Sequence, residues 1–136
     1  MRTRIPYTPA AMSPFPPGDQ LVLELFVRDF ARSRAFYLAL GFEVEREEEG
    51  FAFLRFDQCG LMLQHSSRLG ELPRRPAANL RILVETIAEV DAKWDLARSL
   101  GAPVFVPIGD REYGLRDFIV LDPDGFGVRF AAPIEG

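Results

Sequence analysis

Residues 20–41 of this 136-residue chain read QLVLELFVRDFARSRAFYLALG and contain the local signals that decide its fold. Apolar residues occupy every second position of the segment 21–27, and this alternation predicts a β-strand. Asp29 is suited to cap a helix N-terminus, and the apolar spacing of 31–40 predicts the helix. Gly41 supplies the residue that ends it in a left-handed conformation. The stretch therefore predicts a strand followed at once by a helix.

The same order of elements occurs twice along the chain. After the first helix, alternation predicts three strands, at 42–46, 51–56 and 61–65, with turns at 47–50 and 57–60. A second strand and helix follow at 79–85 and 86–100, and the helix begins at a capping box formed by Thr86 and Glu89. Three more strands are predicted at 104–108, 115–121 and 126–131, separated by a loop at 109–114 and an Asp-Pro-Asp-Gly turn at 122–125.

These elements predict an α+β fold built from two βαβββ modules, 20–67 and 79–133, within one domain of residues 20–136. A single helix covers one face of a sheet, so the other face must meet a second module. We therefore expect two curved mixed sheets around a shared cleft. Residues 1–19 hold five of the 11 prolines and are predicted to form an extended arm, which either reaches over a partner subunit or frays.

Composition excludes several classes of function. The net charge is -4 and the arginines are scattered, so nucleic acid is not expected as a partner. No apolar run reaches the roughly 20 residues of a membrane helix, and the single cysteine, Cys59, favours a reducing cytoplasm. With one histidine, His65, a Cys/His zinc site cannot form within one chain. His65 lacks a recognisable catalytic partner and is predicted to be a surface residue, whereas the 20 acidic residues leave an all-oxygen metal site possible.

Strand alternation also predicts which side chains face the cleft. On each strand the wholly apolar row should pack on the helix and the mixed row should face the other way. The polar and aromatic members of the mixed rows are the predicted ligand contacts: Glu24, Phe26, Gln64, Asn79, Arg81 and Arg129. Val22, Met62 and Leu83 share these rows, and the strand 51–56 is apolar on both faces and stays unassigned. A mostly apolar wall with a few polar groups is typical of a small-molecule site.

Two of these roles have alternatives that the sequence leaves open. A buried carboxylate needs a partner, so Glu24 either forms a fixed ion pair with Arg81 or Arg129, or contacts a ligand. Tyr113, beside a glycine in the loop 109–114, either stacks on a planar ligand or covers the core. Arg116, at the end of that loop, is a further predicted ligand contact.

Two stretches, LFVRDFARSRAFYLALGFEV (25–44) and YGLRDFIVLDPDGFGVRF (113–130), resemble the signature stretches of the vicinal oxygen chelate superfamily. This superfamily includes glyoxalases, dioxygenases and the fosfomycin- and bleomycin-resistance proteins. The strand GLMLQH (60–65) and the junction YGLRDF (113–118) are most similar to the bleomycin-resistance type. The resemblance implies paired βαβββ modules and a homodimer.

The resemblance also places the four metal-ligand positions of the metal-dependent members at Val22, Met62, Asn79 and Arg129. Valine and methionine cannot hold a hard divalent ion, and arginine repels one. We therefore predict no metal and no cofactor, and no catalytic residues. The expected function is a metal-independent binding protein that sequesters a planar drug or metabolite, as antibiotic-resistance proteins do.

Other functions remain open from the sequence. Arg81 and Arg129 disfavour a cationic drug and suit an acidic metabolite. The alternative function is a metal-dependent glyoxalase-like lyase or dioxygenase with a degenerate or displaced metal site. A third possibility is a structural subunit whose cleft is filled by its own side chains.

Overall fold

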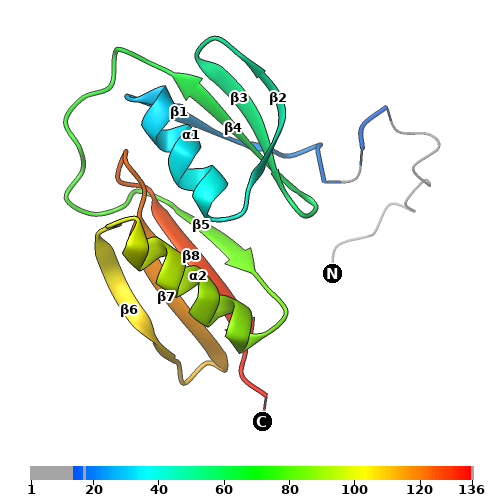
Figure 1. Cartoon of the computed structure of the whole chain (residues 1–136), viewed down its shortest axis with the longest axis vertical. Coiled ribbons are helices and arrows are strands. Elements are labelled where there is room, and N and C mark those ends of the chain that lie inside the picture. The colour runs from blue at the N-terminus through cyan, green and yellow to red at the C-terminus, as the bar shows by residue number, and fades with distance from the viewer. Residues whose placement is uncertain (1–13, 17, 136) are drawn as a thin grey trace, which may run out of the picture.

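The computed structural model describes residues 14–16 and 18–135, and it confirms the two βαβββ modules (Figure 1). The first module consists of β1 (Leu23–Val27), α1 (Phe30–Ala39), β2 (Glu43–Glu48), β3 (Phe51–Phe56) and β4 (Cys59–His65). The second consists of β5 (Asn79–Leu83), α2 (Ile87–Ser99), β6 (Val104–Asp110), β7 (Leu115–Leu121) and β8 (Gly127–Pro133). Most of the predicted arm, residues 1–13 and Pro17, lies outside the described residues.

Each module forms a mixed four-stranded sheet, as predicted. The strand orders are β1-β4-β3-β2 and β5-β8-β7-β6. In each sheet the first and last strands of the module pair in parallel, and the remaining pairs are antiparallel. The crossover helix lies against one face, where β1 and β4 bury apolar residues such as Leu25 and Leu63. No helix in the described residues has the length and apolarity to cross a membrane.

The helix ends follow the predicted signals. The Asp29 carboxylate accepts a hydrogen bond from the amide of Arg32, and the Thr86 hydroxyl accepts one from the amide of Glu89. Both glycines that follow the helices adopt positive φ, 109° at Gly41 and 71° at Gly101. These conformations are strained for other residues, which explains why each helix ends there.

The boundaries of three hairpins differ from the prediction. β2 continues through Glu47 and Glu48, which pair with β3, so the charged turn is shorter than expected. β4 starts at Cys59 rather than after a turn at 57–60, and β6 runs on to Asp110 instead of ending at 108. In each case the antiparallel partner strand continues opposite, and its backbone hydrogen bonds extend the strand despite polar or glycine-containing sequence.

The two modules meet through their helix-covered sides. The rings of Phe56 on β3 and Phe130 on β8 lie 5.9 Å apart, and the Lys93 ammonium of α2 donates a hydrogen bond to the carbonyl of Leu40 after α1. Trp94 of α2 is partly buried and packs edge-on against Phe118 of β7. Because the helices and this junction share one side, the other face of each sheet is left uncovered by the chain.

A buried network of carboxylates fastens the β7–β8 turn of the second module to the first. The Tyr37 hydroxyl of α1 donates a 2.5 Å hydrogen bond to Asp122 Oδ2, and Asp122 Oδ1 accepts from the amides of Asp124 and Phe126 at 2.9 Å. Asp124 in turn forms a 2.8 Å ion pair with Arg28. Burial and the neighbouring Asp122 carboxylate raise the pKa of Tyr37 well above its usual value. The Asp-Pro-Asp-Gly sequence thus forms the predicted turn and also joins the modules.

Candidate functional site

The uncovered face of the first sheet carries the predicted row of β1 and β4. Glu24 lies opposite Met62 and Phe26 lies opposite Gln64 in the parallel pair. Leu25 is buried against the helix side, so alternation turns its neighbours to the uncovered face. The Phe26 side chain is 49% exposed, which is unusual for a large apolar residue in mid-strand.

Strand β3, which the sequence left unassigned, adds aromatic rings to this face. Ala52 and Leu54 are fully buried on the helix side, so Phe51 and Phe53 occupy the uncovered face opposite Gln64 and Met62. The guanidinium groups of Arg46 and Arg55 lie 5.0 and 5.1 Å from the two ring centroids. We define the aromatic face as Phe26, Phe51, Phe53, Met62 and Gln64.

The uncovered face of the second sheet is positively charged. Arg81 of β5 pairs in register with Arg129 of β8, and Asn79 pairs with Gly127. The Asn79 amide lies over Gly127, where any side chain would collide with it. Leu83 is 56% exposed at the end of the row. Two guanidinium groups on neighbouring strands therefore share one uncovered face.

The Arg129 guanidinium is fixed by a buried carboxylate. Asp117 of β7 is 2% exposed, and its Oδ2 accepts hydrogen bonds from Arg129 Nε and Nη2 at 2.9 and 2.5 Å. Arg111 Nε donates to Oδ1 at 2.8 Å, and the Tyr113 hydroxyl donates to Oδ2 at 2.8 Å. Arg129 also lies over the Tyr113 ring, 5.7 Å from its centroid. We call this set, with Arg81 beside it, the arginine face.

The arrangement bears on one alternative for each of the two roles that the sequence left open, the ion pair of Glu24 and the covering of the core by Tyr113. Arg129 pairs with Asp117, and Glu24 forms no ion pair with any residue that the structure describes. Glu24 is therefore available to other contacts at the first sheet. Tyr113 does not cover the core, because its hydroxyl belongs to the Asp117 cluster and the residue is 60% exposed.

Of the eight predicted contacts, Arg116 stands apart. Its Nε donates to Asp91 of α2 and its Nη1 donates to Asp110, both at 2.9 Å, on the helix-covered side of the sheet. The physical reason is alternation, since Asp117 faces the uncovered side and its neighbour must face the helix. The other seven lie on the two uncovered faces, with Glu24, Phe26 and Gln64 on the first sheet.

The sequence reasoning missed Asp117 and Arg111. A signal for Asp117 was present, because it is a charged residue directly before the apolar run 118–121 and lies on the same row as Ile119. Such a residue is stable there only with partners. Arg111 gave no signal, since it lies in a turn and reaches Asp117 through a contact that alternation does not predict.

Two opposing effects set the charge of Asp117. Burial acts to raise the pKa of its carboxyl, but the hydrogen bonds from Arg111, Arg129 and Tyr113 outweigh burial and lower the pKa below 3.8. The Asp117 carboxylate therefore stays ionised at neutral pH and holds the Arg129 guanidinium in place.

This shift predicts how the stability contributed by Asp117 varies with pH. A carboxyl whose pKa is lowered by folding stabilises the protein above its unfolded value and loses that effect as the pH falls through its folded value. Compared with Asp117→Asn, the wild type should be more stable above about pH 4, and the difference should shrink below it. Urea unfolding of both proteins from about pH 6 to about pH 2 measures this difference. A difference that grows as the pH falls would contradict the assignment.

The four positions implied for metal ligands do not fit a divalent ion. Of Val22, Met62, Asn79 and Arg129, only Asn79 offers an oxygen, and Arg129 brings a positive charge. Within residues 14–16 and 18–135, no group of three or more His, Cys, Asp or Glu side chains is placed to hold a metal ion. The face instead presents guanidinium groups, which bind anions.

Comparison with known proteins identifies the family of this chain. The pattern of the Glyoxalase/Bleomycin resistance protein/Dioxygenase superfamily matches residues 19–130, which is most of the chain. The chain belongs to this superfamily. Membership explains the repeated modules and the location of both signature stretches, and it leaves the subtype within the superfamily undetermined.

Solved structures of other proteins share the superfamily fold. A hypothetical protein from S. aureus is 22% identical with a TM-score of 0.72, and the match covers 84% of this chain and 93% of that one. A superfamily protein from Alicyclobacillus acidocaldarius is 23% identical, with a TM-score of 0.69 and coverage of 88% and 95%. A lactoylglutathione lyase from Agrobacterium tumefaciens is 24% identical, with a TM-score of 0.65 and coverage of 85% and 95%. No functionally curated protein matches the sequence significantly. These identities establish the fold alone.

Proposed function

We propose that this superfamily member is a metal-independent binding protein that sequesters a planar small molecule carrying an anionic group. One observation carries the proposal: a buried carboxylate, Asp117, holds Arg129 on an uncovered sheet face, where the resemblance implies a metal ligand in the metal-dependent relatives. A fixed guanidinium is a ready-made site for a carboxylate or phosphate. Sequestration requires no catalytic acid or base.

The aromatic face supports a planar ligand. Phe26 on β1 and Phe51 and Phe53 on β3 flank β4, whose Gln64 and Met62 lie between them on the same uncovered face. Aromatic rings stack on flat apolar molecules, and Met adapts to their outline. A ligand whose planar part stacks on the aromatic face and whose anionic group pairs with the arginine face would contact both surfaces.

The protein is proposed to act as a homodimer. In the single chain the two modules meet through their helix sides, so neither uncovered sheet face is closed by the other. Exposed apolar residues on these faces, Phe26 and Leu83, favour burial against a second copy. The unpaired Glu24 of one sheet complements the arginine face of the other in charge. Dimerisation would then close the cleft.

The bleomycin-resistance type remains the subtype that we infer within the superfamily. Its supporting features are the GLMLQH strand, which forms β4, and the YGLRDF junction, which contains Tyr113 and Asp117. The arginine face argues that the sequestered molecule is acidic rather than cationic. Resistance to a drug by this protein therefore requires a drug with an anionic group.

Binding of 2-naphthoate, a planar aromatic carboxylate, tests the proposal by calorimetry. We expect saturable binding that EDTA does not change and that Arg81→Gln weakens about tenfold, since a charge-assisted contact is lost. Arg116→Gln is the matched control, because that guanidinium lies on the helix side, and it should change the affinity less than about twofold. The cation 2-naphthylmethylammonium should bind more weakly than 2-naphthoate.

Several results would contradict the proposal. They are the absence of saturable 2-naphthoate binding, binding that requires a divalent ion, and equal losses of affinity in Arg81→Gln and Arg116→Gln. Sedimentation velocity of the same wild-type sample tests the dimer. If the protein is a monomer at the concentrations of the titration, the proposed cleft between two copies does not form.

A further inference from the structure

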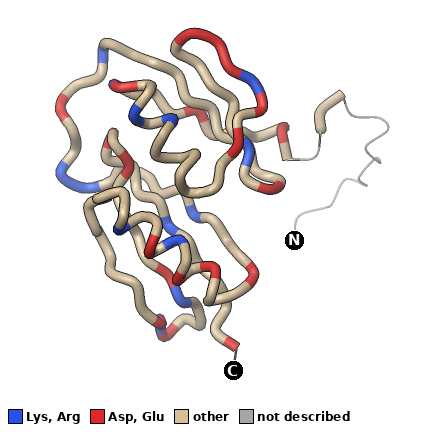
Figure 2. Tube along the Cα trace, viewed as in Figure 1, with Lys and Arg blue, Asp and Glu red and all other residues tan. Residues whose placement is uncertain are grey.

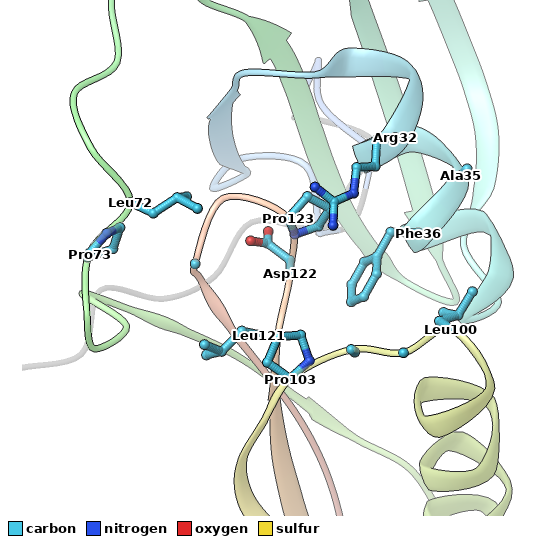
Figure 3. Close-up of a pocket in the computed structure, with 13 residues that line it drawn as sticks. Arg32, Ala35, Phe36, Leu72, Pro73, Leu100, Pro103, Leu121, Asp122 and Pro123 are labelled. Carbon is cyan, nitrogen blue, oxygen red and sulfur yellow. The ribbon is translucent and has the colours of Figure 1, made fainter.

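A cavity of about 380 Å³ lies between the two modules (Figure 3). Four segments that are far apart in sequence line it. They are α1, the linker between β4 and β5, the connection from α2 to β6, and the β7–β8 turn. Its size falls within the range of small-molecule sites. Nothing in the function proposed above uses it.

The walls of the cavity are mostly apolar. Figure 3 shows the Phe36 ring pointing from α1 toward Pro103 and Leu100. Leu121 and Leu72 lie across the cavity from this ring. Phe36 is almost fully buried, and its ring packs edge-on against Tyr37, 5.1 Å away between centroids. This packing holds the Phe36 side of the cavity wall in one position.

Two charged side chains face the cavity, and only one of them is free. The Asp122 carboxylate is occupied, since its Oδ2 accepts from Tyr37 and its Oδ1 accepts from two backbone amides. Arg32 extends from α1 toward the turn in Figure 3. Its guanidinium has no hydrogen-bond or ion-pair partner among the residues that the structure describes. The free charge of the cavity is therefore positive.

We propose that this cavity is a second binding site, which takes a small apolar monocarboxylate. The carboxylate pairs with the Arg32 guanidinium, and the hydrocarbon part lies between Phe36, Leu100 and Leu121. The occupied Asp122 carboxylate repels the ligand's charged end and so sets its orientation toward Arg32. An apolar cavity with one free cation at its edge fits this class better than it fits a neutral or cationic molecule.

Occupation of this site would stabilise the junction of the modules. The lining residues come from both modules, so a ligand there contacts α1 and the β7–β8 turn at the same time. A ligand that binds only the folded junction raises the melting temperature, and the rise continues with the logarithm of its concentration above the Kd. The site is thus coupled to the relative position of the modules, which also sets the position of both sheet faces.

Octanoate is the probe for the test, with 1-octanol as its neutral counterpart. We expect calorimetry to show saturable octanoate binding, a rise in melting temperature, and binding of 1-octanol at least about tenfold weaker. Arg32→Gln should weaken octanoate about tenfold, and Ala35→Trp should abolish binding by filling the cavity. Ala35→Ser, at the same exposed helix position, should bind like the wild type and shows that the fold tolerates a change there.

The control Arg81→Gln separates this proposal from the proposed function. It should reduce 2-naphthoate binding and leave octanoate binding unchanged. If Arg81→Gln loses octanoate binding and Arg32→Gln keeps it, the carboxylate binds at the arginine face. That result would overturn the second site. Absence of saturable octanoate binding, or equal binding of 1-octanol, would also overturn it. Neither of these results would bear on 2-naphthoate at the sheet faces.

Discussion

Replacing Asp117 by asparagine is expected to lower the free energy of unfolding by about 3 kcal/mol, because removing one member of a buried ion pair leaves its partners unpaired. Arg111 and Arg129 both donate to this carboxylate, and Tyr113 adds a third hydrogen bond. The asparagine amide keeps the size of the side chain but carries no charge. The loss should therefore come from electrostatics rather than from a cavity.

Urea unfolding at neutral pH measures this effect, with Asp110→Asn as the control. Asp110 also pairs with an arginine on the same sheet, Arg116, but its side chain is 61% exposed. An exposed ion pair contributes less than about 1 kcal/mol, so the control should be close to the wild type. Similar losses in both variants would show that Asp117 does not act as a buried anchor.

Replacing Asp122 by alanine is expected to lower the free energy of unfolding by about 3 kcal/mol or more. Three donors lose their acceptor, namely the Tyr37 hydroxyl and the amides of Asp124 and Phe126. Each unsatisfied buried donor costs about 1–3 kcal/mol. Because Tyr37 belongs to the first module, the loss should also loosen the junction between the modules.

Asp122→Asn is the matched control for this second substitution. The asparagine oxygen can still accept from the two amides, and its amide group can donate to the Tyr37 oxygen. Burial raises the pKa of the Asp122 carboxyl despite the hydrogen bonds that it accepts, so a neutral side chain of the same shape avoids part of the cost of burying charge. Thermal and urea unfolding should rank the wild type and Asp122→Asn close together and both well above Asp122→Ala. An Asp122→Ala protein as stable as Asp122→Asn would show that the hydrogen bonds to Asp122 do not hold the two modules together.

The fold was largely predictable because its signals are local. Alternation located the strands, and Asp29 and Thr86 capped the helices where the sequence placed them. The errors lie at hairpins, as at Glu48 and Asp110, where pairing with a neighbouring strand decides the boundary. Pairing energy depends on a strand elsewhere in the chain, which a local pattern does not contain.

The candidate site was predictable only in part. Period-two alternation placed six of the predicted side chains on the uncovered faces, since the buried row marks the opposite side. It did not reveal that Asp117 holds Arg129, or that Asp122 binds Tyr37, because these contacts join residues of different strands or modules. Arg116 was predicted from its place at the end of the loop, whereas alternation along β7 turns its side chain to the helix side, where it pairs with Asp91 of α2. Figure 2 shows Lys and Arg interspersed with Asp and Glu along both modules. Net charge alone therefore could not locate the contacts of Asp117 or those of Asp122.

Metal-independent binding is tested most directly by calorimetric titration of the chelator-treated protein with Mn²⁺, an ion that oxygen ligands hold. We predict no saturable binding, and 2-naphthoate affinity that is the same with and without the ion. Binding of one Mn²⁺ per chain that Asn79→Ala or Glu24→Gln weakens, together with 2-naphthoate binding only when the ion is present, would contradict the proposal.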